Sequence, residues 1–359
     1  MKLDKNMLDI YSDYLICSFG YTTATGLSRA VDGVFAHDKV TRFLSARKYD
    51  SKTLWKVVKK NVRETESEQG VILFDDTIIE KQYTDENDII AWHWDHSKGR
   101  SVKGVNMLSC IYQNKGINIP VAFDVVKKTK KFKDKKTGKL KRRSEVTKNE
   151  QFREMIGICV RNNRIKLKWI LADVWYSSAE NMRFIKSELK RDFIMPIKSN
   201  RLVALSKRDK TNGNFVNVET LDFKKDTEVI LYIKGINFPV AVIKKVFINE
   251  DGSIGILYLA CSDTTKQGYH IYDIYNKRWN IEGYHKSIKT NIGLAKSPTK
   301  TEITQNNHFF ASIYAYLKLE LLKCKTNLNH FAIKSRLYVK ALKTSINELE
   351  YLKTESLCA

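Results

Sequence analysis

The order of apolar segments in the first half of the chain restricts its fold most strongly. Three short runs rich in apolar and β-branched residues follow one another: VILFDD (71–76), VNMLSCIYQN (105–114) and INIPVAFDVV (117–126). Helical and apolar stretches then alternate, as a helix at about 148–164, a strand at 167–175, a helix at about 178–191 and a strand at 192–198. Three strands followed by alternating helix and strand predict an α/β fold whose sheet has mixed pairing.

Helical patterns lie on both sides of this region. Residues 1 to about 66 have apolar positions at helical spacing, and Asp50-Ser51 form a cap before KTLWKVVKKNV. Residues 22–47 have the texture of a helix-turn-helix, and a plain helical bundle fits them equally well. Between about 199 and 270 the pattern changes to hairpins, which predicts a β-rich insertion. Helices return at about 268–291, 301–325 and 330–354.

The charge of the chain indicates a polyanionic partner. Its 63 Lys and Arg against 40 Asp and Glu give a net charge of +23, and nucleic acid is the obvious polyanion. Because 43% of the residues are hydrophobic, a disordered cationic tail is excluded as a description of the whole chain. Residues 127–143 place eleven Lys or Arg around one Asp. We read this segment as a loop that either is solvated or contacts DNA phosphates.

Two classes of protein are excluded. No run approaches the roughly 20 apolar residues of a membrane span, and the N-terminal segment mixes charged with apolar residues, so we expect a cytosolic protein and no membrane partner. The six cysteines are scattered without a CxxC pair, so we expect reduced thiols, neither a disulfide framework nor a structural zinc site.

Acidic residues close two of the predicted strands. Asp75 and Asp76 end VILFDD, and Asp173 ends WILAD. A carboxylate at the end of an apolar strand is costly unless it is solvated or binds a cation. Each Asp has two interpretations at this point, a metal ligand or a helix cap and turn residue.

A third acidic residue lies in a run of phosphate-binding side chains. Tyr275, Arg278, Glu282, Lys286 and Lys289 are spaced 3, 4, 4 and 3. At roughly 100° per residue, they share an arc of about 80° on one helix face. The alternative is an ordinary helix with ion pairs such as Glu282 with Lys286, worth a few tenths of a kcal/mol, roughly. That alternative leaves the Tyr and Arg ahead of the Glu unexplained.

This run resembles the Tyr-Arg-Glu-Lys signature of DDE transposases from bacterial insertion sequences, the cut-and-paste group that forms DNA hairpins. Identity and spacing both match. FDDT resembles the first Asp block, with Asp76 as the ligand, and LADVWYSS (171–178) resembles the second, with Asp173. The resemblance covers residues 35–325, includes the β-rich insertion, and implies a ribonuclease H-like catalytic core.

The resemblance also implies the chemistry. Asp76, Asp173 and Glu282 would hold two Mg²⁺, with Mn²⁺ as a substitute, for hydrolysis and strand transfer. Of the other residues, Arg278 and Lys289 would hold phosphates, Tyr275 a terminal phosphate, and Lys286 the DNA backbone. Trp279 would stack against an unpaired base, and a core position is its alternative.

The segment AWHWDHSKGRSVKG offers further DNA contacts. In the family, the corresponding hairpin approaches the transposon end, which suits Lys98, Arg100 and Lys103. His93 and His96 offer metal binding as the weaker alternative.

We expect a helical DNA-binding domain at 1–66, a ribonuclease H-like core at 67–198 and 269–325, a β-rich insertion at 199–268 and a C-terminal helical dimerisation region at 326–359. The expected partners are the terminal inverted repeats and target, both double-stranded DNA, and a second copy of the chain, in the bacterial cytoplasm at the nucleoid. A catalytically silent DNA-binding repressor and a structure-specific nuclease of the same fold are the alternatives.

Overall fold

A computed structural model describes residues 3–135, 137–224 and 227–355. The chain forms two compact units, which we describe separately. The first, here the helical unit, comprises Met1–Leu54, Ile78–Val105 and Gly283–Ala359. The second, here the sheet unit, comprises Trp55–Thr77 and Asn106–Glu282.

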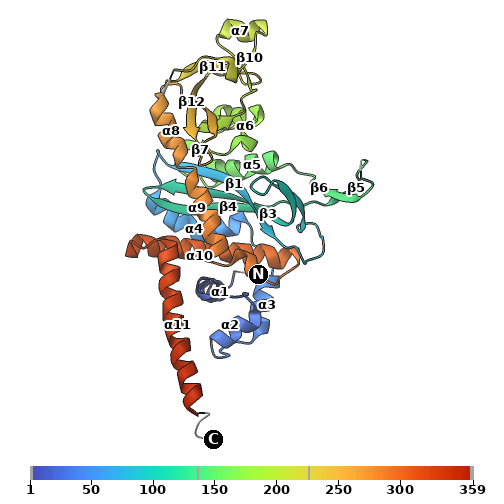
Figure 1. Ribbon diagram of the computed structural model, residues 1–359, viewed down its shortest axis with the longest axis vertical. Coiled ribbons are helices and arrows are strands. Elements are labelled where there is room, and N and C mark those ends of the chain that lie inside the picture. Colours follow the sequence, from blue (N-terminus) through green and yellow to red (C-terminus); the bar gives the residue numbers. More distant parts are fainter. Residues whose placement is uncertain (1–2, 136, 225–226, 356–359) are drawn as a thin grey trace. The chain divides into compact units, whose positions relative to one another are not determined.

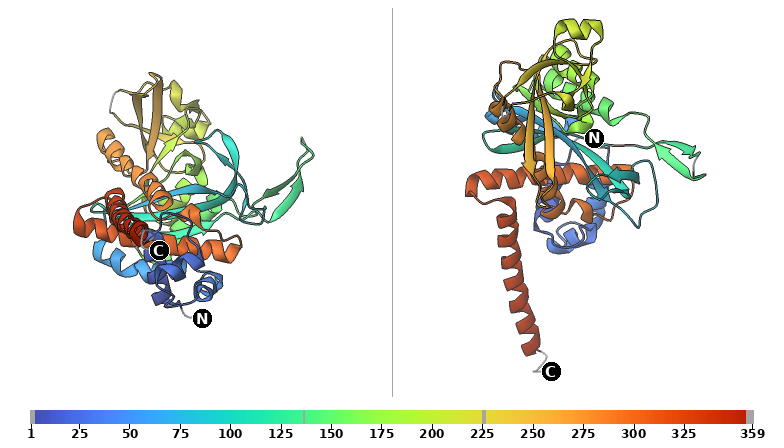
Figure 2. Two further views of the ribbon diagram at one scale, coloured as in Figure 1. Left: turned by 60° about the horizontal axis from the view of Figure 1, so that its bottom comes forward. Right: turned by 45° about the horizontal axis from the view of Figure 1, so that its top comes forward.

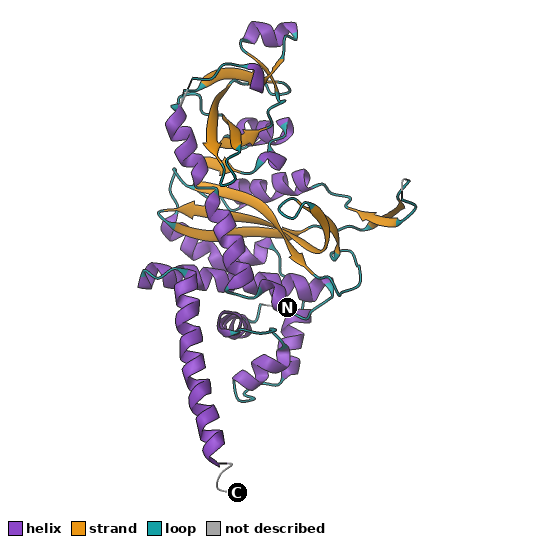
Figure 3. Ribbon diagram, in the orientation of Figure 1, coloured by secondary structure: helices purple, strands orange, loops and turns teal. Residues whose placement is uncertain are grey.

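The predicted strands form the centre of the sheet unit (Figures 1 and 3). β1 (Val71–Glu80) pairs in parallel with β7 (Trp169–Leu171), and β7 pairs in parallel with β8 (Asp192–Ile197). On the other side of β1 lies β3 (Arg100–Asn114), which pairs antiparallel with β4 (Ile117–Val125). Residues 71–74 are fully buried, because a strand in the middle of a sheet covered on both faces needs apolar side chains on both sides. The fold is mixed α/β, as predicted.

The strands of the segment 199–270 extend the same sheet. They are β9 (Leu202–Ala204), β10 (Val216–Asn217), β11 (Val229–Ile233), β12 (Val240–Ile248) and β13 (Ile254–Cys261). All of their pairings are antiparallel, and β13 continues the sheet by pairing with β8. This pairing covers what would otherwise be the exposed edge of β8.

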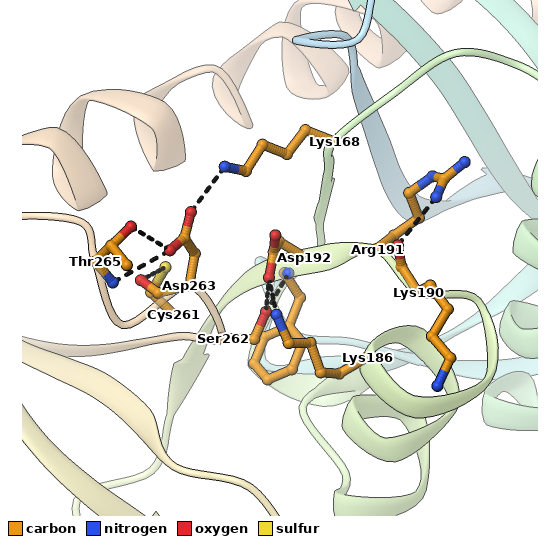
Figure 4. A network of polar contacts seen from close by, with 10 residues as sticks. Lys168, Lys186, Lys190, Arg191, Asp192, Cys261, Ser262, Asp263 and Thr265 are labelled. Atoms are coloured by element: carbon orange, nitrogen blue, oxygen red, sulfur yellow. Dashed lines mark hydrogen bonds and ion pairs between the residues drawn. The ribbon is translucent and has the colours of Figure 1, made fainter.

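Ion pairs and hydrogen bonds join the ends of β7, β8 and β13, next to the paired residues of these strands (Figure 4). Asp192 accepts hydrogen bonds from the Lys186 ammonium at 2.6 Å and from the Ser262 hydroxyl at 2.7 Å. Lys168 donates to Asp263 at 2.7 Å. These pairs tie the beginning of β8 to the residues that follow β13, so the β-rich segment is held to the core at two points.

Short helices connect the strands of the sheet unit. α5 (Lys148–Gly157) continues into a π-helical turn, η1 (Ile158–Asn162), and α6 (Ala179–Arg183) continues into another, η3 (Phe184–Glu188). Both correspond to predicted helices. η2 (Val174–Tyr176), α7 (Lys207–Asn212) and η4 (Val218–Thr220) are single turns.

We expected the basic segment 127–143 to be a loop. It instead contains a two-stranded ribbon. β5 (Lys130–Lys133) and β6 (Leu140–Arg143) pair antiparallel and extend away from the strands of the sheet unit (Figure 1). The strands were missed because their side chains are almost all charged, so no alternation of apolar residues marks them. Gly138, at φ +68, supplies the left-handed position of the turn. Lys136 lies outside the described residues.

The helical unit is organised around α10 (Glu302–Thr326). α1 (Lys5–Cys17) and α3 (His37–Ser45) pack against it, and α2 (Ala24–Ala30) packs against α3. Asn307 of α10 accepts the N–H of Tyr49 at 2.8 Å and donates to the carbonyl of Leu44 at 2.9 Å. Buried amides therefore fix the N-terminal helices to α10.

α4 (Ser51–Thr65) lies mostly in the sheet unit, which begins at Trp55. The helix begins where predicted, with the Asp50 carboxylate accepting the N–H of Thr53 at 2.8 Å.

The remaining elements of the helical unit are β2 (Ala91–Asp95), which pairs antiparallel with the first residues of β3, the short η5 (Leu294–Lys296), and α11 (His330–Glu355). α11 follows α10 as a long single helix (Figure 2). No helix in the described ranges is long and apolar enough to cross a membrane. Five cysteines lie in those ranges, all as free thiols, and three of them are buried. Cys358 lies outside them.

Candidate active site

Asp76 of the sheet unit accepts three side-chain hydrogen bonds. It lies on β1 three residues beyond the last register pair with β7, Leu73 with Leu171. One oxygen accepts the Tyr176 hydroxyl at 2.6 Å. The other accepts Asn106 Nδ2 at 2.8 Å and Lys148 Nζ at 2.7 Å. Burial acts to raise the pKa of Asp76, but the charge of Lys148 and these hydrogen bonds outweigh it and lower the pKa.

Asp75 has a different environment, because neighbouring residues of a strand point to opposite faces. Its carboxylate lies 3.7 Å from the Arg278 guanidinium. Burial, and then the negative charges of Asp173 and Asp76, raise the pKa of Asp75 to about 7. The sequence left the role of Asp75 open. Its carboxylate is the one that both of the other strand-end carboxylates, Asp76 and Asp173, oppose in ionising.

Asp173 follows β7 by two residues and caps the turn η2. Its Oδ1 accepts the N–H of Trp175 at 2.9 Å. Burial raises the pKa of Asp173, and the charge of Asp76 raises it further. The capping interpretation is therefore confirmed, but the cap does not exclude another role, since one hydrogen bond leaves the carboxylate with spare acceptor capacity.

The signature run lies on two helices, not on one as predicted. α8 (Gly268–Asn276) ends after Tyr275, and α9 (Trp279–Thr290) begins after Arg278. At the junction, the N–H groups of Lys277 and Arg278 bond to carbonyls three residues earlier, as in a tighter helical turn. The break leaves Tyr275 beside Arg278, whose guanidinium lies 5.8 Å from the centre of the Tyr275 ring. Burial raises the pKa of Tyr275 to about 12.

Glu282 forms an ion pair with Arg278 at 2.7 Å, not with Lys286 as the ordinary-helix interpretation expected. The guanidinium also lies 5.1 Å from the centre of the Trp279 ring. Arg278 thus contacts Asp75 and Glu282 at once. Trp279 is 58% exposed, so the alternative of a core position is wrong.

The other predicted DNA-binding residues lie in the helical unit. Lys286 stands 5.4 Å from the centre of the Phe331 ring. Burial lowers the pKa of Lys289, and the negative charge of Asp95 opposes this shift. Lys98 pairs with Glu80, while Arg100 and Lys103 lie on β3 opposite Asp95 and Trp92 of β2.

The histidines of the same hairpin differ in exposure. His93 is buried within β2, whereas His96 is exposed beyond its end. Within residues 3–135, 137–224 and 227–355, no three His, Cys, Asp or Glu side chains are grouped closely enough to hold a metal ion. The hairpin therefore lacks the ligand set that the metal-binding alternative requires.

A comparison with known families identifies the class of protein to which the chain belongs. The family model of the DDE superfamily endonucleases matches residues 3–212. The chain belongs to the DDE superfamily endonuclease family. A search of curated proteins gives no match. Membership identifies the chain as a nuclease or transposase type of enzyme that acts on DNA. The match includes Asp76 and Asp173 and ends before the signature run.

Enzymes of the DDE superfamily typically use divalent metals, and the acidic residues here suit such ions chemically. Asp75 and Asp173 are mostly buried, and burial raises the pKa of both. The negative charge of Asp76 raises both pKa values further, and the charge of Asp173 adds to the effect on Asp75. A divalent cation bound by these hard oxygen ligands would remove that repulsion. Glu282, the third predicted ligand, is paired with Arg278.

Sequence reasoning missed three residues that hold Asp76. Tyr176 lies within the second Asp block, three residues after Asp173, so its position was a usable signal. Lys148 opens α5 after a capping box formed by Thr147 and Glu150, and Asn106 lies in β3. Nothing local connects either residue with Asp76, because the contacts are between elements far apart in the chain.

Proposed function

We propose that this DDE endonuclease is a transposase that cleaves and joins DNA by two-metal phosphodiester chemistry at Asp76, Asp173 and Glu282. The observation that carries the proposal is the position of the first two. Both follow the last paired residues of neighbouring parallel strands, at Leu73 and Leu171, and the charge of Asp76 acts on Asp173. The carboxyl ends of such strands meet at one edge of a sheet.

Strand order supports the ribonuclease H-like core that the family resemblance implies. The order β4-β3-β1-β7-β8 combines an antiparallel pair, β3 with β4, and parallel pairing of β1 with β7 and of β7 with β8. The first Asp lies on the central strand and the second directly after its parallel neighbour. This arrangement puts both on one sheet, as the proposed mechanism requires.

Bound metal ions would activate the attacking oxygen and stabilise the leaving oxygen of the phosphodiester. The chain's own residues prepare the carboxylates. Lys148 and Tyr176 hold Asp76 in one orientation, and Arg278 holds Glu282. An incoming phosphate competes for the Arg278 guanidinium, since arginine binds phosphate and carboxylate through the same fork. DNA binding therefore releases Glu282 for the metal.

The finer steps follow the signature that the sequence carries. The 3′ end is first cut by water, its hydroxyl attacks the opposite strand to form a hairpin, and the reopened end is transferred to target DNA. In this proposal Tyr275, Lys286 and Lys289 contact phosphates of the terminal inverted repeat. Trp279, exposed beside Arg278, is available to stack against a base. Lys98, Arg100, Lys103 and the β5–β6 ribbon add phosphate contacts.

A homodimer is part of the proposal, and the sequence of α11 supports it. Val339, Leu342, Ile346 and Leu349 are spaced 3, 4 and 3, and each is 44–53% exposed. A β-branched residue alternating with Leu at this spacing favours a parallel two-stranded coiled coil. Two copies joined in this way would bring two DNA ends together.

Cleavage of a labelled inverted-repeat duplex in Mg²⁺ tests the proposal. Asp76→Ala, Asp173→Ala and Glu282→Ala should each abolish cleavage and leave DNA binding intact. Glu250→Ala, which removes an exposed carboxylate elsewhere in the sheet unit, is the matched control and should cut normally. Retained cleavage in any of the three variants would refute the three-carboxylate assignment.

The same preparation separates the two alternatives. A repressor would bind the duplex and leave it uncut in Mg²⁺. A structure-specific nuclease would cut it but would not join a pre-cut end to a plasmid. A joined product that disappears in Asp173→Ala is the outcome that the transposase proposal requires.

A further inference from the structure

A cavity of the sheet unit lies beside Asp173, and its chemistry differs from that of the acidic candidate active site. It has a volume of about 580 Å³, within the range typical of ligand sites. Its polar and aromatic lining consists mainly of Asn149, Trp175, Lys198, Asn200, Arg201 and Lys234. No carboxylate is among the described residues that line it, so its charge is positive where that of the neighbouring site is negative.

The cations of this cavity, Lys198, Arg201 and Lys234, are held by a rigid backbone. Lys198 and Arg201 flank the tight turn between β8 and β9, which is closed by a hydrogen bond from the Arg201 N–H to the Lys198 carbonyl at 2.9 Å. The Val218 N–H bonds to the Arg201 carbonyl at 2.9 Å, and the Lys234 N–H bonds to the Leu202 carbonyl at 2.9 Å. The three cationic residues therefore come from one fixed corner of the sheet.

Arg201 indicates what the cavity lacks. Its Nε is buried and has no hydrogen-bond partner in the described part of the chain. Burial also lowers the pKa of its guanidinium, which means that the charged form is poorly solvated. A buried donor without an acceptor is costly, typically by more than the value of one hydrogen bond. An anionic ligand in the cavity would stabilise the poorly solvated charge of Arg201.

Trp175 gives the cavity an aromatic surface and connects it with the carboxylates. The side chain is 53% exposed although it follows a buried strand. Its backbone N–H bonds to Asp173, and Lys148, which holds Asp76, lies 5.8 Å from the centre of its ring. A ligand stacked on this ring would therefore lie close to Asp173 and to Lys148, the residue that holds Asp76.

We propose that this cavity binds one nucleotide of an unpaired DNA strand, with the base stacked on Trp175 and the phosphates on the cavity cations. An exposed aromatic ring beside a group of cations is the usual combination for single strands, because every base has a face to stack and every linkage has a charge. In duplex DNA the bases are already stacked, so the ring would have no base to bind. The inference rests on the proposed function in taking DNA as the ligand.

Fluorescence anisotropy with a labelled oligothymidylate of about 15 nucleotides tests the inference on the full chain, in EDTA and about 0.15 M salt. Trp175→Ala should weaken binding about tenfold or more, and Arg201→Gln several-fold, while Trp175→Phe should retain most of the affinity. An unlabelled duplex of equal length should compete poorly with the single strand.

Two matched variants serve as controls. Tyr269→Ala removes a ring that is 50% exposed on α8, and Arg208→Gln removes an exposed positive charge on α7, both outside the cavity. Both should bind as the wild type does. Wild-type affinity in Trp175→Ala, an equal loss in the controls, or equal affinity for duplex and single strand would overturn the inference. If Trp175→Ala fails to fold, Trp175→Phe and Arg201→Gln decide.

The test is independent of catalysis, because EDTA prevents any metal-dependent step. A chain that binds through Trp175 but never cuts DNA would contradict the proposed function and keep this inference. A chain that cuts DNA but binds single strands without Trp175 would contradict only this inference.

Discussion

Buried polar residues occur in both units, but their environments differ. Around α10 of the helical unit, Glu320 accepts from Lys323 at 2.6 Å and lies 3.0 Å from His330, which in turn contacts Ser287 at 2.8 Å. In the sheet unit, burial and then the negative charge of acidic neighbours raise the pKa values of Asp75 and Asp173. Glu320 is paired with the Lys323 ammonium and stabilises a fold. Asp75 and Asp173 lie among carboxylates that oppose their ionisation, which is typical of a functional site.

The largest expected effect is on activity. Asp173→Asn keeps the cap of η2, since Asn also accepts the Trp175 N–H, but removes the negative charge. Metal-dependent cleavage should fall by about 10³-fold or more, because a metal ion supplies several kcal/mol of transition-state stabilisation. Thermal unfolding in EDTA should occur at an equal or higher temperature than in the wild type, since a repulsive charge is lost. A lower unfolding temperature would show that Asp173 serves the fold.

The opposite result is expected in the helical unit. Asn307→Ala leaves the Tyr49 N–H and the Leu44 carbonyl without partners and should lower the free energy of unfolding by about 2–4 kcal/mol. Urea unfolding measures this, and Asn214→Ala, at an exposed position, should change it by less than about 0.5 kcal/mol. A small effect of Asn307→Ala would mean that the buried amides of α10 do not hold the N-terminal helices.

Lys148 combines both kinds of environment, because it is a cation that pairs with Asp76, a candidate metal ligand. Lys148→Met leaves Asp76 partly buried without its counter-ion, so the unfolding temperature in EDTA should fall and Mg²⁺ should restore part of it. Lys186→Met is the matched control, since Lys186 pairs with Asp192 at 2.6 Å with similar burial. In the control Mg²⁺ should restore nothing. Equal Mg²⁺ effects in both variants would contradict a cation site at Asp76.

The smallest expected effect is a pH dependence of stability. The pKa of Asp75 is about 7 in the folded chain, against about 3.9 for an unperturbed Asp. The folded state therefore binds this proton more tightly than the unfolded state, and Asp75 makes stability fall as pH rises from about 4 to 7. Asp75→Asn should flatten that decline in a series of urea unfolding curves. An unchanged decline would mean that Asp75 ionises normally.

The sequence predicted the parts of the fold that local patterns determine. The apolar run at residues 71–74 marked a central strand, and Asp50 marked the beginning of α4. The break between α8 and α9 was missed because residues 276–278, Asn-Lys-Arg, contain neither Gly nor Pro. The β5–β6 ribbon was missed because charge hides its alternation.

The candidate site was predicted only in part for a related reason. Strand-end position pointed to Asp75, Asp76 and Asp173, and spacing pointed to Arg278 and Glu282. The choice of Asp76 over Asp75 came from the family resemblance. The contacts that lower the pKa of Asp76 come from tertiary structure. Lys148, for example, lies 72 residues from Asp76 in sequence. The Arg278–Glu282 pair could have been weighed from its i to i+4 spacing, but only the structure shows that it forms.

The most direct test of the account is the position of Mn²⁺ in crystals of the protein bound to inverted-repeat DNA, located by its anomalous scattering. The account predicts Mn²⁺ bound by Asp76, Asp173 and Glu282, with Arg278 moved from Glu282 to a DNA phosphate. Mn²⁺ bound elsewhere, or Glu282 still paired with Arg278 in a complex that cuts its DNA, would contradict it.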